Sequence, residues 1–274
     1  TVTWIVDGNE TVDTYNYGDT IVKPADPEKV GYTFTDWSAE IPTTVPDEDL
    51  VFTATWQAKE YNVTWNVDGE ISTDTYYFDD AITAPTPEKD GYFFIGWDKV
   101  VPDTMPAESL EFVAQWSKVE YEFEFDGNGI IITAAKDASG DIEIPAIING
   151  YPVIAIDECA FVGSDITSVT IFEGVESIGL FAFAYCDKLE TVNIPSSVTE
   201  IDYGAFSGCS NIETINISAD NNNFVTDEYG VVYTEGFIEL VYAPAKSVGE
   251  AYAMRSTATY IYPFAFSDCS DFAL

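Results

Sequence analysis

The sequence predicts a mainly β protein in which two small β-rich repeat modules are followed by a β-rich solenoid. Three observations support this prediction. A unit of about 60 residues occurs twice at the start of the chain, a 23-residue unit recurs later, and aromatic residues make up 15% of the 274 residues. Aromatic and β-branched side chains suit pleated sheets, and a short fixed period is typical of coils that stack on one another.

The two N-terminal modules share one order of strand and turn signals. Trp4 recurs in the second copy as Trp65, and Trp56 recurs as Trp116, with one residue lost between two prolines of the second copy. A surface loop tolerates such a deletion. Each copy predicts strand, turn, strand, a proline-rich crossover, strand, loop and strand. The expected modules are residues 1–58 and 59–119.

The second module carries a motif that resembles a known family. Residues 91–97 read Gly-Tyr-Phe-Phe-Ile-Gly-Trp, and Met-Pro-Ala-Glu at 105–108 and Ala-Gln-Trp at 114–116 follow. This set is similar to the Listeria–Bacteroides repeat, also called the internalin B-repeat. The resemblance implies a small β-grasp-like module that serves as a spacer or stalk on bacterial surface proteins. The first copy departs from the motif at Asp36, where the family has glycine before the tryptophan.

The tryptophans and tyrosines of these modules have two possible roles. They could form a platform on which sugar rings stack, or they could pack in the module cores. Aromatic side chains dominate core burial, and these positions recur with the repeat, so we favour core packing.

The solenoid is predicted from a pattern of isoleucine and phenylalanine. Four isoleucines each precede a phenylalanine at the same spacing, and the second and third of these phenylalanines lie one repeat unit apart. A coil of this kind buries its apolar face only against its neighbours, so we expect the phenylalanines to form one inward column. The pairs are Ile156–Phe161, Ile178–Phe183, Ile201–Phe206 and Ile261–Phe266.

Residues 120–274 form the expected solenoid domain. Residues 121–125 and 130–133 alternate around a Gly-rich turn, which predicts a hairpin that caps the first coil. Between Ile217 and Ile261 the period breaks, and we expect an inserted hairpin at about 218–256. The elements Ile-Pro-Ser-Ser-Val-Thr-Glu-Ile at 194–201 and Gly-Ala-Phe-Ser-Gly-Cys at 204–209 resemble the BspA-type leucine-rich repeat. That resemblance implies a surface or secreted protein, and several members resemble adhesins.

Three of the four cysteines occupy one repeat position. Cys186, Cys209 and Cys269 each lie three residues after their phenylalanine. Disulfides or a metal site are the alternatives that four cysteines raise. Because the repeat sets the spacing and no Cys-x-x-Cys occurs, we favour a ladder of buried thiols.

Charge excludes several classes of function. The chain has 48 acidic residues, 10 basic residues and no histidine, which gives a net charge of −38. Such a field repels nucleic acid and anionic lipid. The absence of imidazole excludes Ser-His-Asp and Cys-His catalysis and histidine-bound zinc. No stretch is apolar enough to cross a membrane, and the pattern begins and ends midway, so we expect a piece of a longer protein.

Acidic residues do not mark a catalytic or metal site. A glycosidase needs two carboxylates at a defined separation, and nothing singles out such a pair. Oxygen ligands for calcium occur at residues 220–223 and Asp227, but their spacing does not match an EF-hand loop. We interpret that segment as a turn rich in asparagine. We therefore expect no enzyme activity, no cofactor and no bound metal.

The predicted binding surface is the sheet face of the coils. In each strand the residues between the core positions point outward, so stacking aligns them into polar columns, and such surfaces of solenoids bind partners. The other interpretation is an ordinary solvated face. The candidate binding residues are Thr170, Thr191, Asn193, Thr214 and Asn216.

Together these patterns favour a non-enzymatic, extracellular fragment that is either on the cell surface or secreted. We expect adhesion, or binding to a protein or glycan of a host or neighbouring cell, through the leucine-rich-repeat face, with the first two repeats as spacers. The fragment is expected to be monomeric, without nucleic-acid binding or membrane insertion. The alternatives are a carbohydrate-binding accessory region of a secreted polysaccharide-degrading enzyme and, third, a hydrolase that uses acidic pairs.

Overall fold

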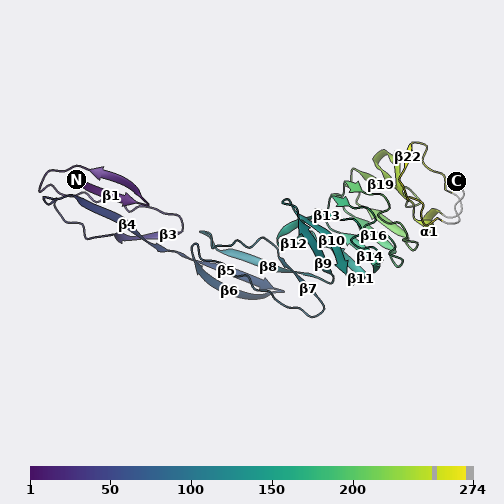
Figure 1. The fold of residues 1–274 in the computed structure, drawn as a ribbon, viewed down its shortest axis with the longest axis horizontal. Coiled ribbons are helices and arrows are strands. Elements are labelled where there is room, and N and C mark those ends of the chain that lie inside the picture. The colour runs from purple at the N-terminus through teal and green to yellow at the C-terminus, as the bar shows by residue number, and fades with distance from the viewer. Residues whose placement is uncertain (249–251, 270–274) are drawn as a thin grey trace. The chain divides into compact units, whose positions relative to one another are not determined.

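A computed structural model describes residues 1–248 and 252–269 of the chain and is nearly all β. The chain forms two compact units, one of residues 1–85 and 101–112 and one of residues 86–100 and 113–274. Figure 1 shows the strands in chain order.

The first module is a mixed four-stranded sheet with the order β2-β1-β4-β3. Strand β1 pairs antiparallel with β2 and parallel with β4, and β3 pairs antiparallel with β4. Asp7 and Gly8 both have positive φ, at 49° and 82°, which suits the tight turn between β1 and β2. The mixed sheet with its central parallel pair confirms the β-grasp-like prediction. The strands are β1 (Val2–Val6), β2 (Asn9–Asp13), β3 (Tyr32–Trp37) and β4 (Leu50–Ala58).

Tryptophans form the core of the first module. Trp4 stacks on Phe52 with 5.0 Å between ring centroids and meets the edge of Trp37 at 4.8 Å. All three side chains are buried, and the Trp4 indole donates a hydrogen bond to Asp13 (2.9 Å). These rings pack in the core and offer no platform for a sugar.

The second module repeats these features. Strand β5 forms an antiparallel hairpin with β6, and β7 pairs antiparallel with β8. The division between the two compact units runs through this module. On the side of the first compact unit, Trp65 stacks on Phe112 with 5.1 Å between ring centroids. On the side of the second, Phe94 meets the edge of Trp116 with 5.6 Å between centroids. The strands are β5 (Glu60–Val67), β6 (Glu70–Tyr77), β7 (Phe93–Trp97) and β8 (Leu110–Ser117).

The solenoid has a first parallel sheet with the order β11-β14-β16-β18. Its registers align Val169 with Val192 and Val192 with Ile215, so equivalent residues of successive coils lie side by side. This stacking is visible in Figure 1. The strands are β11 (Ser139–Ile144), β14 (Asp165–Ile171), β16 (Thr191–Ile194) and β18 (Thr214–Ile217).

A second sheet runs along the solenoid in the order β17-β15-β13-β10-β9, and β12 pairs with β13. Strands β9 and β10 at its other end form the antiparallel hairpin that is predicted to cap the first coil. The Tyr121 hydroxyl of this hairpin donates a 2.6 Å hydrogen bond to the Glu143 carbonyl of β11. The strands are β9 (Glu120–Phe125), β10 (Ile130–Lys136), β12 (Ile147–Ile148), β13 (Tyr151–Ile156), β15 (Ser177–Ile178) and β17 (Glu200–Ile201).

After β18 the coil pattern is interrupted by an antiparallel meander. The order of this sheet is β19-β20-β21-β22, and β22 pairs parallel with β21. Its elements are β19 (Phe224–Thr226), β20 (Val232–Thr234), the 3-10 helix η1 (Glu235–Phe237), β21 (Glu239–Tyr242), α1 (Ala245–Val248) and β22 (Tyr260–Ile261).

A column of aromatic rings runs through the solenoid core. Phe161 stacks on Phe183 at 4.9 Å, and Phe183 stacks on Phe206 at 5.7 Å. The fourth ring differs from the prediction: Tyr242 packs against Phe206 at 5.7 Å, whereas Phe266 packs in a separate cluster. The meander explains this difference, because it places β21 ahead of the coil that carries Phe266.

The cysteines form the expected thiol ladder. Cys186 donates a hydrogen bond to the Phe161 carbonyl (3.1 Å), and Cys209 donates to the Phe183 carbonyl (3.0 Å), each one coil back. Cys269 lies 3.6 Å from the Ala243 carbonyl. All four cysteines are free thiols. The neighbouring Cys186 thiol, and then burial, raise the pKa of Cys209, so this thiol stays protonated at neutral pH.

Candidate functional site

The outward residues of the first sheet form two columns, one residue per coil. Register pairs Ser168 with Thr191 and Thr191 with Thr214 in the first column. It pairs Thr170 with Asn193 and Asn193 with Asn216 in the second. Strand β11 extends the columns by one residue each, with Asp141 beside Ser168 and Glu143 beside Thr170.

The second column is joined by side-chain hydrogen bonds. Asn193 Nδ2 donates to Thr170 Oγ1 at 3.1 Å, and Asn216 Nδ2 donates to Asn193 Oδ1 at 2.8 Å. Thr170, Thr191 and Asn193 are half-buried, whereas Thr214 and Asn216 are exposed. The structure therefore brings all five predicted residues onto one face and holds three of them in a fixed ladder.

The first column ends at β11 in an ionised carboxylate. Asp141 Oδ1 accepts hydrogen bonds from Thr167 Oγ1 and Ser168 Oγ, both at 2.8 Å. These bonds, the Thr167 bond first, hold the pKa of Asp141 below its usual range. Because the carboxylate keeps its charge at neutral pH, it is an acceptor for a ligand hydroxyl or amide.

A groove with a volume of about 630 Å³ lies at this end of the face. It lies within the second unit and combines aromatic rings with carboxylates, an amide, hydroxyls and one lysine. Concave sites with a few placed polar groups are typical of ligand binding. The lining side chains include Tyr92, Trp116 and Phe172, together with Gln115, Lys118, Asp141, Glu143, Ser168 and Thr170.

The sequence interpretation missed most of this groove. Asp141 and Glu143 could have been found, because the alternation at residues 141–144 is that of the later strands. Tyr92 and Trp116 belong to the second module, and no periodicity links them to β11. Only the folded structure shows that they line one cavity.

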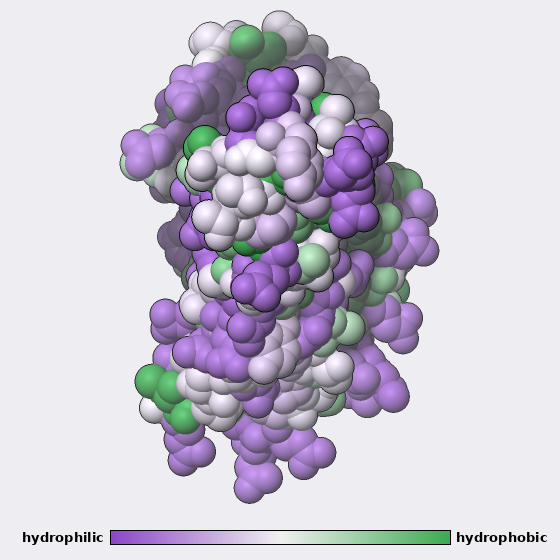
Figure 2. Space-filling view, turned by 90° about the vertical axis from the view of Figure 1, so that its left-hand side faces the viewer, coloured by the Kyte–Doolittle hydropathy of each residue, from purple (hydrophilic) through white to green (hydrophobic). Residues whose placement is uncertain are grey.

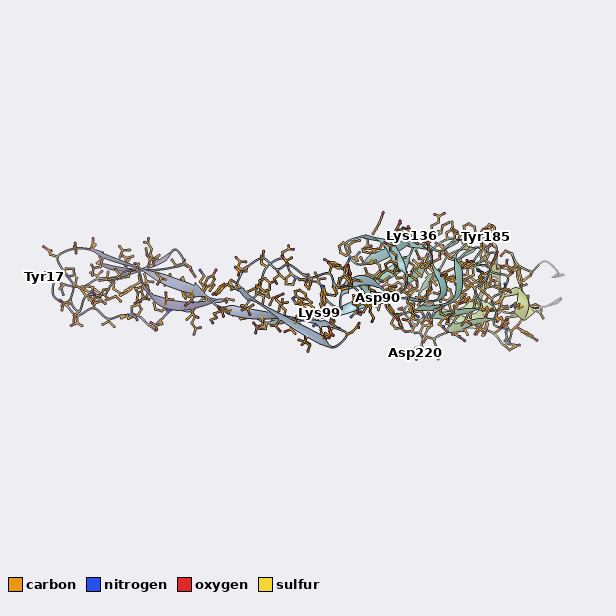
Figure 3. The ribbon with its side chains drawn as sticks, turned by 90° about the horizontal axis from the view of Figure 1, so that it is seen from below. Tyr17, Asp90, Lys99, Lys136, Tyr185 and Asp220 are labelled. Carbon is orange, nitrogen blue, oxygen red and sulfur yellow. The ribbon has the colours of Figure 1, made fainter. Side chains whose placement is uncertain are left out.

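The asparagine-rich segment is a turn, as expected. Asn221 is buried, and its Nδ2 donates to the carbonyls of Pro195 and Val198, both at 2.9 Å. Asp227 Oδ1 accepts hydrogen bonds from the amides of Tyr229 and Val231. Asp220 projects outward from the solenoid (Figure 3). Within residues 1–248 and 252–269, no group of three acidic, cysteine or histidine residues could hold a metal ion.

Fold and surface together define a β-solenoid repeat protein with a polar sheet face. Comparison with family models then identifies the types of repeat in the chain. The Listeria-Bacteroides repeat domain matches residues 1–53 and 61–114, and the BspA type leucine rich repeat region matches residues 142–229 in six copies. The chain thus contains two Listeria–Bacteroides repeats followed by a BspA-type leucine-rich-repeat region.

Known proteins are similar to this chain over part of their length. Internalin H of Listeria monocytogenes is 32% identical over 137 residues, which cover 43% of this chain and 25% of the relative. A putative membrane protein of Evansella cellulosilytica is 30% identical over 131 residues, which cover 41% of this chain and 20% of the relative. The chain spans a quarter or less of the length of these two relatives.

Solved leucine-rich-repeat proteins are also similar. The T. pallidum protein TpLRR is 26% identical with a TM-score of 0.39 and covers 57% of this chain and 66% of its own. A protein from Bacteroides ovatus is 24% identical with a TM-score of 0.35 and covers 56% of this chain and 44% of its own.

The family models and the two named relatives indicate a repeat protein of the surface type. In the described part of the chain, every helix is too short or too polar to cross a bilayer.

Proposed function

We propose that the chain is a non-enzymatic, extracellular fragment that binds a protein or glycan of a host or neighbouring cell. The first sheet of the solenoid provides the binding face, and the two N-terminal repeats act as spacers. Binding of this kind would serve adhesion.

The observation that carries the proposal is the ladder of Thr170, Asn193 and Asn216. Its hydrogen bonds hold amide and hydroxyl groups in place before a partner arrives. A preorganised surface loses less side-chain entropy on binding than a mobile one. Two relatives support a location at the cell surface, since one is named Internalin H and the other a putative membrane protein.

The test is a glycan array and a panel of host-matrix proteins, probed with the full chain. A ligand found there should be lost by Thr214→Arg, because the long cation covers the exposed end of one polar column. The matched control is Thr11→Arg, which makes the same change at an exposed position of β2 in the first spacer. A blank screen with folded protein, or binding that survives Thr214→Arg, would contradict the proposal.

The second candidate is a carbohydrate-binding accessory region of a secreted polysaccharide-degrading enzyme. The groove favours it, because Tyr92 and Trp116 line the same cavity as Asp141 and Glu143, and ligand pockets combine aromatic side chains with a few placed polar groups. Binding restricted to polysaccharides, together with a catalytic domain elsewhere in the parent protein, would support this candidate over adhesion.

A further inference from the structure

The second sheet of the solenoid stops at a free edge. Coil after coil, a backbone N–H donates to an isoleucine carbonyl one coil back: Asp157 to Ile132, Gly179 to Ile156 and Asp202 to Ile178, all within 2.8–2.9 Å. The series ends at Ile201. Among the described residues, β17 pairs with β15 alone, and the meander beyond it belongs to another sheet. An edge strand presents unpaired backbone groups that can template another strand.

A groove of about 560 Å³ lies along this edge. One wall is the continuous segment 199–203, which contains β17. The opposite wall comes from the meander, at residues 222–224, 234–235 and 238–239, and from Tyr262. The groove therefore exists because the inserted meander interrupts the stacking of the coils.

The groove is strongly acidic. Glu200, Asp202, Glu235 and Glu239 line it, and none of the residues that line it is a lysine or arginine. The nearest cations along the meander are engaged elsewhere, because Arg255 pairs with Glu228 and Lys246 pairs with Glu213. No ion pair in the described ranges reaches the four carboxylates, so their charge is available to a partner.

Tyrosines flank the carboxylates. Tyr203 is 40% exposed, and its ring meets the edge of Tyr262 at 5.0 Å. The Tyr262 hydroxyl donates to Glu239 Oε2 at 3.3 Å. Burial, and then the Glu239 carboxylate, raise the pKa of Tyr262 to about 12, so the phenol remains neutral. Tyrosine faces attract lysine and arginine cations.

We propose that this groove binds a short, extended, cationic segment of a partner protein. The segment adds a strand to the free edge of β17, and its lysine or arginine side chains meet the four carboxylates and the two tyrosines. Main-chain pairing supplies affinity and alternate side chains supply specificity in this mode of recognition. The site is separate from the polar columns and does not depend on their ligand.

The test uses the full chain and an acetylated, amidated Lys-Val-Lys-Val-Lys peptide, titrated calorimetrically in about 0.15 M salt. Two further peptides of the same sequence carry backbone N-methyl groups on the lysines or on the valines. Only alternate N–H groups face a neighbouring strand, so one isomer should lose binding by at least about tenfold and the other should retain it. Equal binding of all three peptides would overturn the strand addition.

A charge-matched pair of variants tests the location. Glu200→Gln with Glu239→Gln removes two groove carboxylates, and Glu28→Gln with Glu48→Gln makes the same charge change on exposed residues of the first module that lie outside its strands. The groove variant should weaken peptide binding by at least about tenfold, with no loss in the control. Equal loss in both, or no binding to the unaltered chain, would overturn the proposal. Circular dichroism checks that each variant is folded.

Discussion

Asn193 is the central residue of the polar ladder. It donates to Thr170 and accepts from Asn216, while Asn216 makes one of these bonds only. Residues with two partners should contribute more to stability than residues with one, because each net hydrogen bond contributes about 0.5–1.5 kcal/mol.

Asn193→Ala should therefore lower the free energy of unfolding by about 1–2 kcal/mol. Asn216→Ala is the matched control and should cost about half as much, since it removes one bond from a more exposed position. Urea unfolding followed by circular dichroism measures both. Equal losses would show that the ladder does not act through Asn193.

A second residue-scale feature is the left-handed position three residues after each coil isoleucine. Cys159, Phe181, Gly204 and Phe264 occupy it, with φ between 55° and 67°. Gly204 has an additional constraint, because a Cβ added there would lie 2.4 Å from the Phe181 ring. The coil thus sets the left-handed backbone conformation at this position. Glycine is needed at residue 204 because the Phe181 ring of the preceding coil occupies the space that a Cβ would take.

Gly204→Ala should be more destabilising than Gly140→Ala. Both glycines have a positive φ, at 65° and 68°, but a Cβ on Gly140 would meet open space. The left-handed strain alone costs about 1–2 kcal/mol, so any excess at Gly204 measures displacement of the Phe181 ring. Thermal and urea unfolding of the two variants supply the comparison. A larger loss at Gly140 would contradict the steric account.

At the scale of elements, the aromatic column connects the coils. Tyr121 of the capping hairpin meets Phe161 at 6.4 Å, and Tyr242 of β21 meets Phe206 at 5.7 Å. A tyrosine thus lies at each end of a phenylalanine stack. Each tyrosine places its ring on the stack. The Tyr121 hydroxyl donates to the Glu143 carbonyl at 2.6 Å, and the Tyr242 hydroxyl donates to Asp268 Oδ2 at 3.3 Å.

Phe183→Ala should lower the free energy of unfolding by about 3–5 kcal/mol, because this buried ring stacks on both neighbours. Phe264→Ala is the control. That side chain is 52% exposed, so its loss should cost less than about 1 kcal/mol. Denaturant unfolding monitored in the far ultraviolet tests both. A small effect at Phe183 would mean that the coils do not depend on the column.

Much of the fold could be predicted from the sequence, because repeated elements report their own spacing. The strands of the first sheet, the capping hairpin, the thiol ladder and three of the four column rings follow from the period. Phe266 was misplaced because a period does not reveal which residue an insertion brings into the stack. Both grooves escaped prediction for a related reason. Trp116 and Asp141 come to line one groove, and Glu200 and Glu239 the other, only after the chain has folded.

At the scale of the whole molecule, the main feature is the large excess of negative charge. Acidic residues outnumber basic ones by 48 to 10, and the surface seen in Figure 2 is largely hydrophilic. Ion pairs such as Lys188 with Asp165 and Lys246 with Glu213 are exposed at their side chains, and exposed pairs contribute little. Repulsion among carboxylates should therefore outweigh attraction at neutral pH.

Raising sodium chloride from about 0.01 M to about 1 M should increase the unfolding temperature by several degrees. The screening length falls from about 30 Å to about 3 Å over this range, which weakens the repulsion that destabilises a highly charged compact state. Scanning calorimetry at neutral pH measures the change. Near pH 4 the effect should shrink, because many carboxylates are then protonated. A fall in unfolding temperature with salt would contradict this account.

The cysteine pattern of the solenoid has a practical consequence. Cys186 and Cys209 are buried and Cys269 is partly covered, whereas Cys159 is exposed at a turn of the first coil. A thiol-reactive reagent added to the native chain should therefore attach at Cys159 first. That residue offers a single chemical handle for immobilising the protein or for linking it to a dye or bead, without introducing a new cysteine.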